Sequence, residues 1–270
     1  MPDIDELSLG ARLSELTALF AAASPVELAE AISRQCREAQ GMNSTSLAYG
    51  ELCMTDTTAL VERIATKHMG FRDGGTLVDI GSGAGLALLA ASLPHRFDRA
   101  YGIEILSGLH RKAEENLAQW QSQSANEGST SNISFVEGDI TEIESKLGVT
   151  ALKVSQTVLF ETWCHLDVLG VGKAPSSSKA EFMPAANWWS DRNLALVIIH
   201  ATVFDGDLFS SVQLRAEECP VGCWFLCVTK ELRTGPRTNM VTVERVRCRA
   251  SWGEATIAIQ RRVDFHSNME

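Results

Sequence analysis

The 270-residue sequence contains no run of about 18 apolar residues, the length that a membrane-spanning helix needs. Its first residues lack a basic segment followed by an apolar one, so we expect no secretory signal. The seven cysteines are odd in number and lie among apolar neighbours, which favours buried thiols in a reducing compartment over a disulfide framework. With 45% hydrophobic and 21% charged residues, the composition is that of a soluble globular protein.

Positive charge is scarce outside one segment. The chain has 24 Lys and Arg against 34 Asp and Glu, a formal charge of −10, which argues against broad, charge-driven binding of nucleic acid. Residues 228–262 contain eight basic and three acidic residues, whereas residues 1–227 contain 16 basic and 29 acidic ones. The basic segment is either a set of solvated strand edges that resist pairing or a patch for an acidic partner surface.

Patterns that indicate a metal site or nucleobase chemistry are weak or missing. Cys219, Cys223 and Cys227 recur every four residues, but no second pair and no nearby His follows, so we expect no metal site. Pro220 follows Cys219, the reverse of the Pro-Cys nucleophile of cytosine methyltransferases. The Asp/Asn-Pro-Pro-Tyr/Phe tetrad of enzymes that methylate base amino groups is also absent.

The N-terminal part is predicted to be helical. Residues 5–40 have helical periodicity, and Ser24 followed by Pro25 and Glu27 predicts a helix start with Ser24 as the capping residue. Asp56 is the predicted cap of the next helix. We therefore divide the chain into a helical segment with a loop, residues 1–55, and a main domain, residues 56–270.

Strands and helices alternate in the second part. Strands are predicted at residues 76–80, 99–105, 133–136 and 194–199, and further alternating strands from about residue 224. Helices at residues 86–93 and 107–121 separate the first three strands, which predicts an α/β fold with a mostly parallel sheet and helices on both faces. Residues 121–132 read as a polar loop, and residues 143–186 as an insertion with a mobile part at 170–186.

Acidic residues stand at three successive strand ends, and glycines follow the first. Asp79 precedes a run with glycine at every second position, where the backbone can approach a ligand closely. A dinucleotide fingerprint would need a glycine at position 86, which is Leu. Glu104 ends the second strand, where a carboxylate can accept hydrogen bonds from ribose hydroxyls, and Asp139 follows the third.

This arrangement resembles motif I of class I S-adenosylmethionine (AdoMet) methyltransferases, and the chain more closely resembles the Dot1 family of histone H3 lysine methyltransferases. The resemblance covers residues 45–142 and 187–262. It is carried by Tyr49-Gly50-Glu51, Asp79-Ile80-Gly81-Ser82-Gly83, Tyr101-Gly102-Ile103-Glu104, the segment 188–204 and Ser251-Trp252. One departure is His200-Ala201, where the family has a pair of asparagines.

The resemblance implies a Rossmann-like class I methyltransferase fold, the cofactor S-adenosyl-L-methionine and no metal. It implies that Tyr49 and Phe204 form walls of the catalytic channel, with Trp252 in support. His200, which replaces an asparagine of the family, is a further candidate catalytic residue as a polar contact, or else a buried histidine with a structural role. The implied cofactor-binding residues are Tyr49, Glu51, Thr57, Asp79, Gly81, Ser82, Gly83, Gly85, Glu104, Asp139 and Ile140.

It further implies a nuclear, chromatin-regulating enzyme whose partner is histone H3 in the nucleosome, with little DNA contact. Arg233 and Arg237, in the loop at residues 232–237, are the expected contacts to the acidic patch of the histone core. Two alternatives remain open. One is a class I methyltransferase for RNA or a small molecule, and the other is a non-catalytic AdoMet-binding protein.

Overall fold

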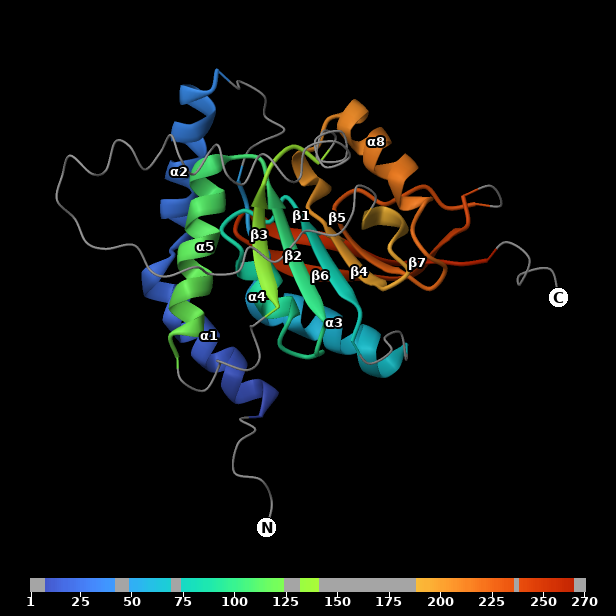
Figure 1. The fold of residues 1–270 in the computed structure, drawn as a ribbon, viewed down its shortest axis with the longest axis horizontal. Helices are drawn as coiled ribbons and strands as arrows, with labels where there is room; N and C mark the ends of the chain where they lie inside the picture. Colours follow the sequence, from blue (N-terminus) through green and yellow to red (C-terminus); the bar gives the residue numbers. More distant parts are fainter. Residues whose placement is uncertain are drawn as a thin grey trace, which may run out of the picture.

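The computed structural model describes residues 8–41, 49–68, 74–123, 132–140, 188–235 and 238–264. The whole predicted insertion at residues 143–186, including the part expected to be mobile, lies outside the described residues, as does Arg237. The described residues form one seven-stranded sheet with helices packed on it (Figure 1).

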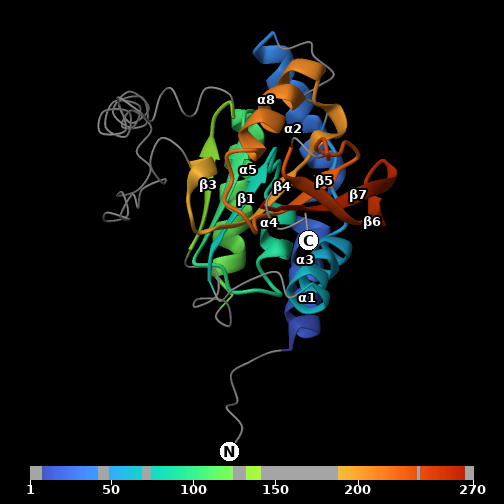
Figure 2. The ribbon, with the colours of Figure 1, turned by 90° about the vertical axis from the view of Figure 1, so that its right-hand side faces the viewer.

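The sheet confirms the predicted mostly parallel arrangement. Its strand order is β3-β2-β1-β4-β5-β7-β6, and the five strands from β3 to β5 are parallel, whereas β7 and β6 are antiparallel additions. Figure 2 shows β3 and β6 at opposite edges. The strands are β1 (Thr76–Ile80), β2 (Arg99–Glu104), β3 (Ile133–Glu137), β4 (Leu194–Ile199), β5 (Trp224–Val228), β6 (Met240–Ala250) and β7 (Gly253–Arg262).

Helices cover both faces of the sheet. One face packs against α1, α3, α4 and α5 through a core that includes Trp120, and the other packs against α8 and two short 3-10 helices through a core that includes Trp189. The helices are α1 (Leu9–Ala23), α2 (Val26–Ala39), α3 (Met54–Lys67), α4 (Leu86–Ala91), α5 (Ser107–Gln121), η3 (Trp188–Ser190), η4 (Ala201–Val203) and α8 (Gly206–Ala216).

Central strands are apolar because both of their faces are covered. All five residues of β1 are buried, and so are all five of β5. Successive residues of these strands enter opposite cores: Leu77 joins the α1–α5 side and Val78 the α8 side. This double burial fixes the level at which each strand ends, and so the position of the residues that follow it.

Two predicted helix caps are wrong. Ser24 ends α1 instead of capping α2, and its hydroxyl accepts a hydrogen bond from buried Asn116 at 3.2 Å. Asp56 lies within the first turn of α3, which begins after Cys53, and its carboxylate pairs with Arg249 at 2.8 Å. In both cases the polar side chain that the local pattern predicts as a helix cap interacts instead with a residue distant in the sequence.

The helices at residues 9–39 pack against the rest of the domain. Gly108 of α5 lets α2 approach closely, since a Cβ there would lie 2.5 Å from the Cys36 sulfur. In the described part of the chain, no single helix has the length and composition of a membrane span; residues 9–21 and 26–39 meet that test only as a pair bent by 57°.

Candidate functional site

The carboxyl ends of β1, β2 and β4 meet at one edge of the sheet. The register places Ile80 beside both Ile103 and Ile199. Residues next to these positions therefore lie together, namely Asp79 of β1, Glu104 of β2 and His200 after β4. Asp79 is fully buried and Glu104 is 7% exposed. The structure thus brings the two predicted acidic residues Asp79 and Glu104 together with His200, which is distant from both in the sequence.

The glycine-rich segment 81–85 forms the turn from β1 into α4. The N–H groups of Gly81 and Ser82 donate to the carbonyl of Ile103 at 2.9 and 3.0 Å, which fastens the turn to β2. Gly83 has a φ of +55°, and a Cβ there would lie 2.6 Å from the Tyr49 ring. No other residue type suits both the backbone angle and this contact, so the turn is built for close approach of another group.

The Glu104 carboxylate holds this turn through hydrogen bonds to backbone N–H groups. One of its carboxylate oxygens accepts the N–H of Gly83 at 2.8 Å, and the other accepts that of Leu106 at 2.9 Å. Burial raises the pKa of Glu104, although these N–H donors act in the opposite direction. Each carboxylate oxygen has a second lone-pair direction, so the residue can hold the turn and still accept from a ligand hydroxyl.

Asp79 and His200 face each other inside the site. The Nε2 atom of His200 lies 3.0 Å from one Asp79 oxygen, an ion-pair distance, but the two atoms do not have hydrogen-bond geometry. Within the described residues, both Asp79 oxygens and the Ser82 hydroxyl are buried without a hydrogen-bond partner. Burial lowers the pKa of His200, but Asp79, Glu104 and Glu51 together outweigh it with their negative charge, so the pKa is raised.

The loop at residues 49–53 is joined to the turn between β6 and β7. Glu51 and Ser251 exchange two hydrogen bonds: the Glu51 N–H donates to the Ser251 hydroxyl at 3.1 Å, and the Ser251 N–H donates to the Glu51 carbonyl at 2.8 Å. Leu52 forms an isolated antiparallel bridge with Ala250. The Tyr-Gly-Glu and Ser-Trp segments, on which the family resemblance partly rests, therefore form one structural unit.

Aromatic rings cover the glycine turn from this loop. The Tyr49 ring lies over Gly83, and its hydroxyl donates to a Glu51 carboxylate oxygen. The Trp252 ring, which is 44% exposed, lies so close to Gly50 that a Cβ there would be 2.3 Å from it. Burial raises the pKa of Glu51 to about 7, while His200 lowers it and Glu30 of α2 raises it further.

Phe204 completes the predicted channel group from the other side. A Cβ on Gly81 would lie 3.6 Å from the His200 Cβ and 4.0 Å from the Phe204 ring, so both side chains flank the turn. The Lys230 ammonium donates to the Phe204 carbonyl. Lys230 is absent from the sequence-based prediction, because its position depends on the pairing of β4 with β5 and no local motif marks it.

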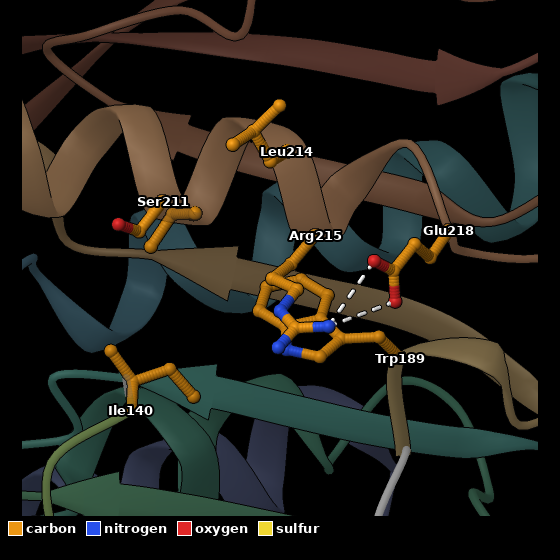
Figure 3. Close-up of a pocket in the computed structure, with 7 residues that line it drawn as sticks. Ile140, Trp189, Ser211, Leu214, Arg215 and Glu218 are labelled. Atoms are coloured by element: carbon orange, nitrogen blue, oxygen red, sulfur yellow. Dashed lines mark hydrogen bonds and ion pairs between the residues drawn. The ribbon is translucent and has the colours of Figure 1, made fainter. Parts of the chain in front are cut away.

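Other predicted site residues lie at the margins or have local partners. The Thr57 hydroxyl is buried and donates to the Cys53 carbonyl at 3.1 Å within the start of α3. Asp139 follows β3, and Ile140 lines a separate hollow of about 310 Å³ beside α8, together with Trp189 and Arg215 (Figure 3). Of this hollow's lining residues, only Ile140 belongs to the predicted cofactor set, so the hollow is distinct from the site at the glycine turn.

Only part of the predicted partner-binding loop is described. The Arg233 side chain is exposed, and its backbone N–H donates to the Gln213 side chain from α8. Gly235 pairs with Met240 across the turn, with a φ of +149°. The arginine is thus held on the surface at the α8 side of the sheet.

The described residues fit the cofactor that the resemblance implies. Unpartnered, buried oxygens on Asp79 and Ser82 need donors, and an ammonium or hydroxyl group of AdoMet would supply them. The glycine turn leaves no room for a side chain at Gly83 or Gly85, where a Cβ would lie 2.4 Å from Phe135. Buried polar atoms that lack partners are typical of a ligand site.

A family model matches part of the sequence. Residues 31–160 match the family described as "Histone methylation protein DOT1". No curated protein matches the sequence. The motifs after residue 160, including Ser251-Trp252, lie beyond the matched range.

Several solved structures are similar in fold. A putative RNA methyltransferase from Pyrococcus horikoshii has 12% identity and a TM-score of 0.43, covering 80% of this chain and 83% of its own. A putative O-methyltransferase from Klebsiella pneumoniae has 10% identity and a TM-score of 0.45, covering 93% and 97%. Magnesium protoporphyrin IX methyltransferase from Synechocystis, with bound SAM, has 8% identity and a TM-score of 0.44, covering 77% and 79%.

The family match supports S-adenosyl-L-methionine as the cofactor, and the sheet topology agrees with the fold class. The individual roles of the site residues stay predictions. The resemblance to the Dot1 family is confirmed over residues 31–160, and the chain has the Rossmann-like fold of a class I AdoMet-dependent methyltransferase.

Proposed function

We propose that this protein is a protein-lysine N-methyltransferase that acts on histone H3 in the nucleosome. The observation that carries the proposal is the joining of the Tyr49–Glu51 loop to Ser251-Trp252 directly over the glycine turn. These segments are 200 positions apart, and both belong to the resemblance to the histone-methylating family. The family match over residues 31–160 supports the same substrate class.

The residues that would hold the cofactor are those around the glycine turn. Asp79 supplies negative charge, Glu51 lies on the loop over the turn, and Glu104 supplies acceptors for ribose hydroxyls. Gly83 has no side chain, which permits close approach to its backbone. When bound, AdoMet supplies an electrophilic methyl group on a sulfonium. Asp139 and Ile140, after β3, remain the predicted contacts to the adenine side.

The chain's own contribution would be to orient a neutral amine and to exclude water. A free lysine has a pKa of about 10.4, so its uncharged form needs help at neutral pH. Tyr49, Phe204 and Trp252 would form apolar walls, and desolvation between such walls disfavours the ammonium form. Orienting the neutral amine in a channel that excludes water then contributes more to the rate than a strong general base would.

Exposed Arg233 supports a nucleosome partner, because a guanidinium pairs bidentately with carboxylates such as those of a histone acidic patch. Arg237 belongs to the same proposed contact by sequence alone. Action on chromatin would require a nuclear location, which we include in the proposal.

Transfer of a radiolabelled methyl group tests the substrate directly. Nucleosomes, free histones, bulk RNA and a reaction without acceptor would be compared, with Asp79→Asn as the inactive control. We expect label in histone H3 of nucleosomes only. Label in RNA, or none in any acceptor despite AdoMet binding, would contradict the lysine proposal and support one of the alternatives.

The docking contact has its own test. Arg233→Ala, and more strongly the double change with Arg237→Ala, is expected to slow methylation of nucleosomes but leave AdoMet affinity unchanged. Loss of an anchoring arginine at an interface centre commonly costs about 2 kcal/mol or more. Equal steady-state rates for wild type and the double variant would remove this loop from the proposal.

A further inference from the structure

His200 occupies an unusual position for a cationic side chain. Its Nε2 atom lies 3.0 Å from Asp79, the fully buried acid that precedes the glycine turn. Its Cβ lies beside Gly81, so the imidazole lies within the proposed cofactor site. The family resemblance places a neutral asparagine in this segment, and a histidine there adds a group that can carry charge.

Charged groups approach the imidazole from each element around it. Asp79 belongs to β1, Glu104 to β2, and Glu51 to the loop before α3, and all three act on His200 as negative charges. Glu30 of α2 acts in turn on Glu51 as a further negative charge. On the η4 side, the ammonium of Lys230 is bonded to the Phe204 carbonyl. The acidic surroundings stabilise an imidazolium in the cofactor-free protein.

AdoMet brings two positive groups of its own, an ammonium and a sulfonium. A buried carboxylate that already faces an imidazolium cannot pair with a second cation without like-charge repulsion. Moving a buried, paired imidazolium aside without neutralising it would also leave a charge uncompensated. Loss of the His200 proton to solvent removes both costs and frees Asp79.

We propose that His200 couples AdoMet binding to the release of a proton. Its imidazolium holds Asp79 in the cofactor-free protein, and AdoMet binds with release of the His200 proton. The inference rests on the proposed AdoMet-binding function, but not on the identity of the methyl acceptor. AdoMet affinity then rises with pH until His200 is already neutral. Below the pKa of His200, affinity falls by about tenfold for each pH unit.

Titration calorimetry tests the inference without any catalytic step. Binding is measured at about pH 6 and about pH 8, in buffers of differing ionisation enthalpy, so that the number of protons released is obtained. Three ligands separate the charges: AdoMet has both cations, S-adenosylhomocysteine keeps only the ammonium, and 5′-methylthioadenosine has neither. Proton release and pH dependence should decrease in that order.

The variants isolate His200 from its neighbour. Glu51 also titrates near neutrality, so the comparison uses Glu51→Gln and the double variant Glu51→Gln/His200→Asn. At about pH 6 the first should release close to one proton with AdoMet and the second close to none. His68→Asn is the matched control, since His68 faces Glu244 on the opposite face of the sheet and should change nothing.

Each outcome decides a different claim. Equal proton release with and without His200 would overturn the inference and leave the methyltransferase proposal intact. Absence of AdoMet binding in every protein, with circular dichroism showing that each is folded, would overturn both. Proton release that disappears with His200→Asn, in a protein that methylates no histone, would support the inference and contradict only the proposed substrate.

Discussion

The glycine-turn site and the C-terminal hairpin use the same charged residue types in opposite ways. At the site, Asp79 is fully buried, and neither of its oxygens has a hydrogen-bond partner in the described structure. On β6, the exposed Arg245, Arg247 and Arg249 each face a carboxylate, at 2.5, 2.7 and 2.8 Å. The buried carboxylate of Asp79 thus lacks hydrogen bonds where their absence is costly. The exposed arginines of β6 have protein partners although water could hydrogen-bond to them instead.

This contrast separates function from surface chemistry. A buried acid needs a charged or hydrogen-bonding partner, which His200 or a ligand can supply here, whereas exposed ion pairs contribute little and can exchange partners. Three of the eight basic residues in the segment 228–262 are therefore paired charges on the edge strand β6. That arrangement agrees with the first of the two readings of its composition, the solvated strand edge.

The largest expected effect is at the glycine turn. Gly83→Arg should abolish AdoMet binding, because the position combines a φ of +55° with a Cβ site 2.6 Å from the Tyr49 ring. Gly206→Arg is the matched control, since nothing lies within 4 Å of its Cβ position. Calorimetry with AdoMet measures both, and full affinity in the Gly83 variant would show that the turn is not the cofactor cradle.

A pH effect on stability should follow from Glu51. Its pKa is raised from 4.5 to about 7, so the folded protein holds the proton more tightly than the unfolded chain. Stability is therefore greatest at low pH and falls as pH rises from about 4.5 to about 7, by at most about 3 kcal/mol. Glu51→Gln should flatten this decline in urea denaturation of the cofactor-free protein. An identical pH profile in the variant would mean that folding does not raise the pKa of Glu51.

Glu104→Ala should weaken AdoMet binding by about 1–3 kcal/mol, because ribose hydroxyls lose their acceptor. The variant should also loosen the turn, since the N–H groups of Gly83 and Leu106 lose theirs. Glu114→Ala, on the exposed side of α5, is the control. Calorimetry gives the affinity, and hydrogen exchange at residues 81–85 gives the loosening. Wild-type values for both would contradict the role of Glu104.

The smallest effect is expected on the hairpin. Arg247→Ala breaks its contact with Glu254, but both side chains are mostly exposed, at 75% and 63%. The melting temperature and AdoMet affinity should both stay at wild-type values within error. A clear loss of stability would show that the hairpin ion pairs act as a coupled network, which would weaken the contrast drawn above.

The sequence predicted those helices and strands whose buried residues follow a regular apolar pattern. β1, β4 and α5 lie where apolar runs and helical periodicity place them, and the glycine turn lies where its spacing predicts. The fold class followed from this alternation. α8 was missed, although Asp205 caps it through the N–H of Leu208 at 2.8 Å and local sequence carries that signal.

Other features could not be predicted, because they depend on distant partners. Ser24 and Asp56 have the composition of helix caps, yet Asn116 and Arg249 engage their side chains instead. The contact between Asp79 and His200 requires β1 to pair with β4, which no local pattern specifies. The pKa of Glu51 likewise depends on burial that only the assembled loop creates.

The bridge between the loop at residues 49–53 and the turn at residues 249–252 has a consequence for folding kinetics. Hydrogen bonds across a separation of 200 residues close about three quarters of the 270-residue chain into a loop. Contacts of such high sequence separation form late, after the entropy of ordering the intervening chain has been overcome. In a refolding experiment, the parallel sheet should therefore acquire protection before Tyr49 is fixed over Gly83, and cofactor binding should be among the last properties to return.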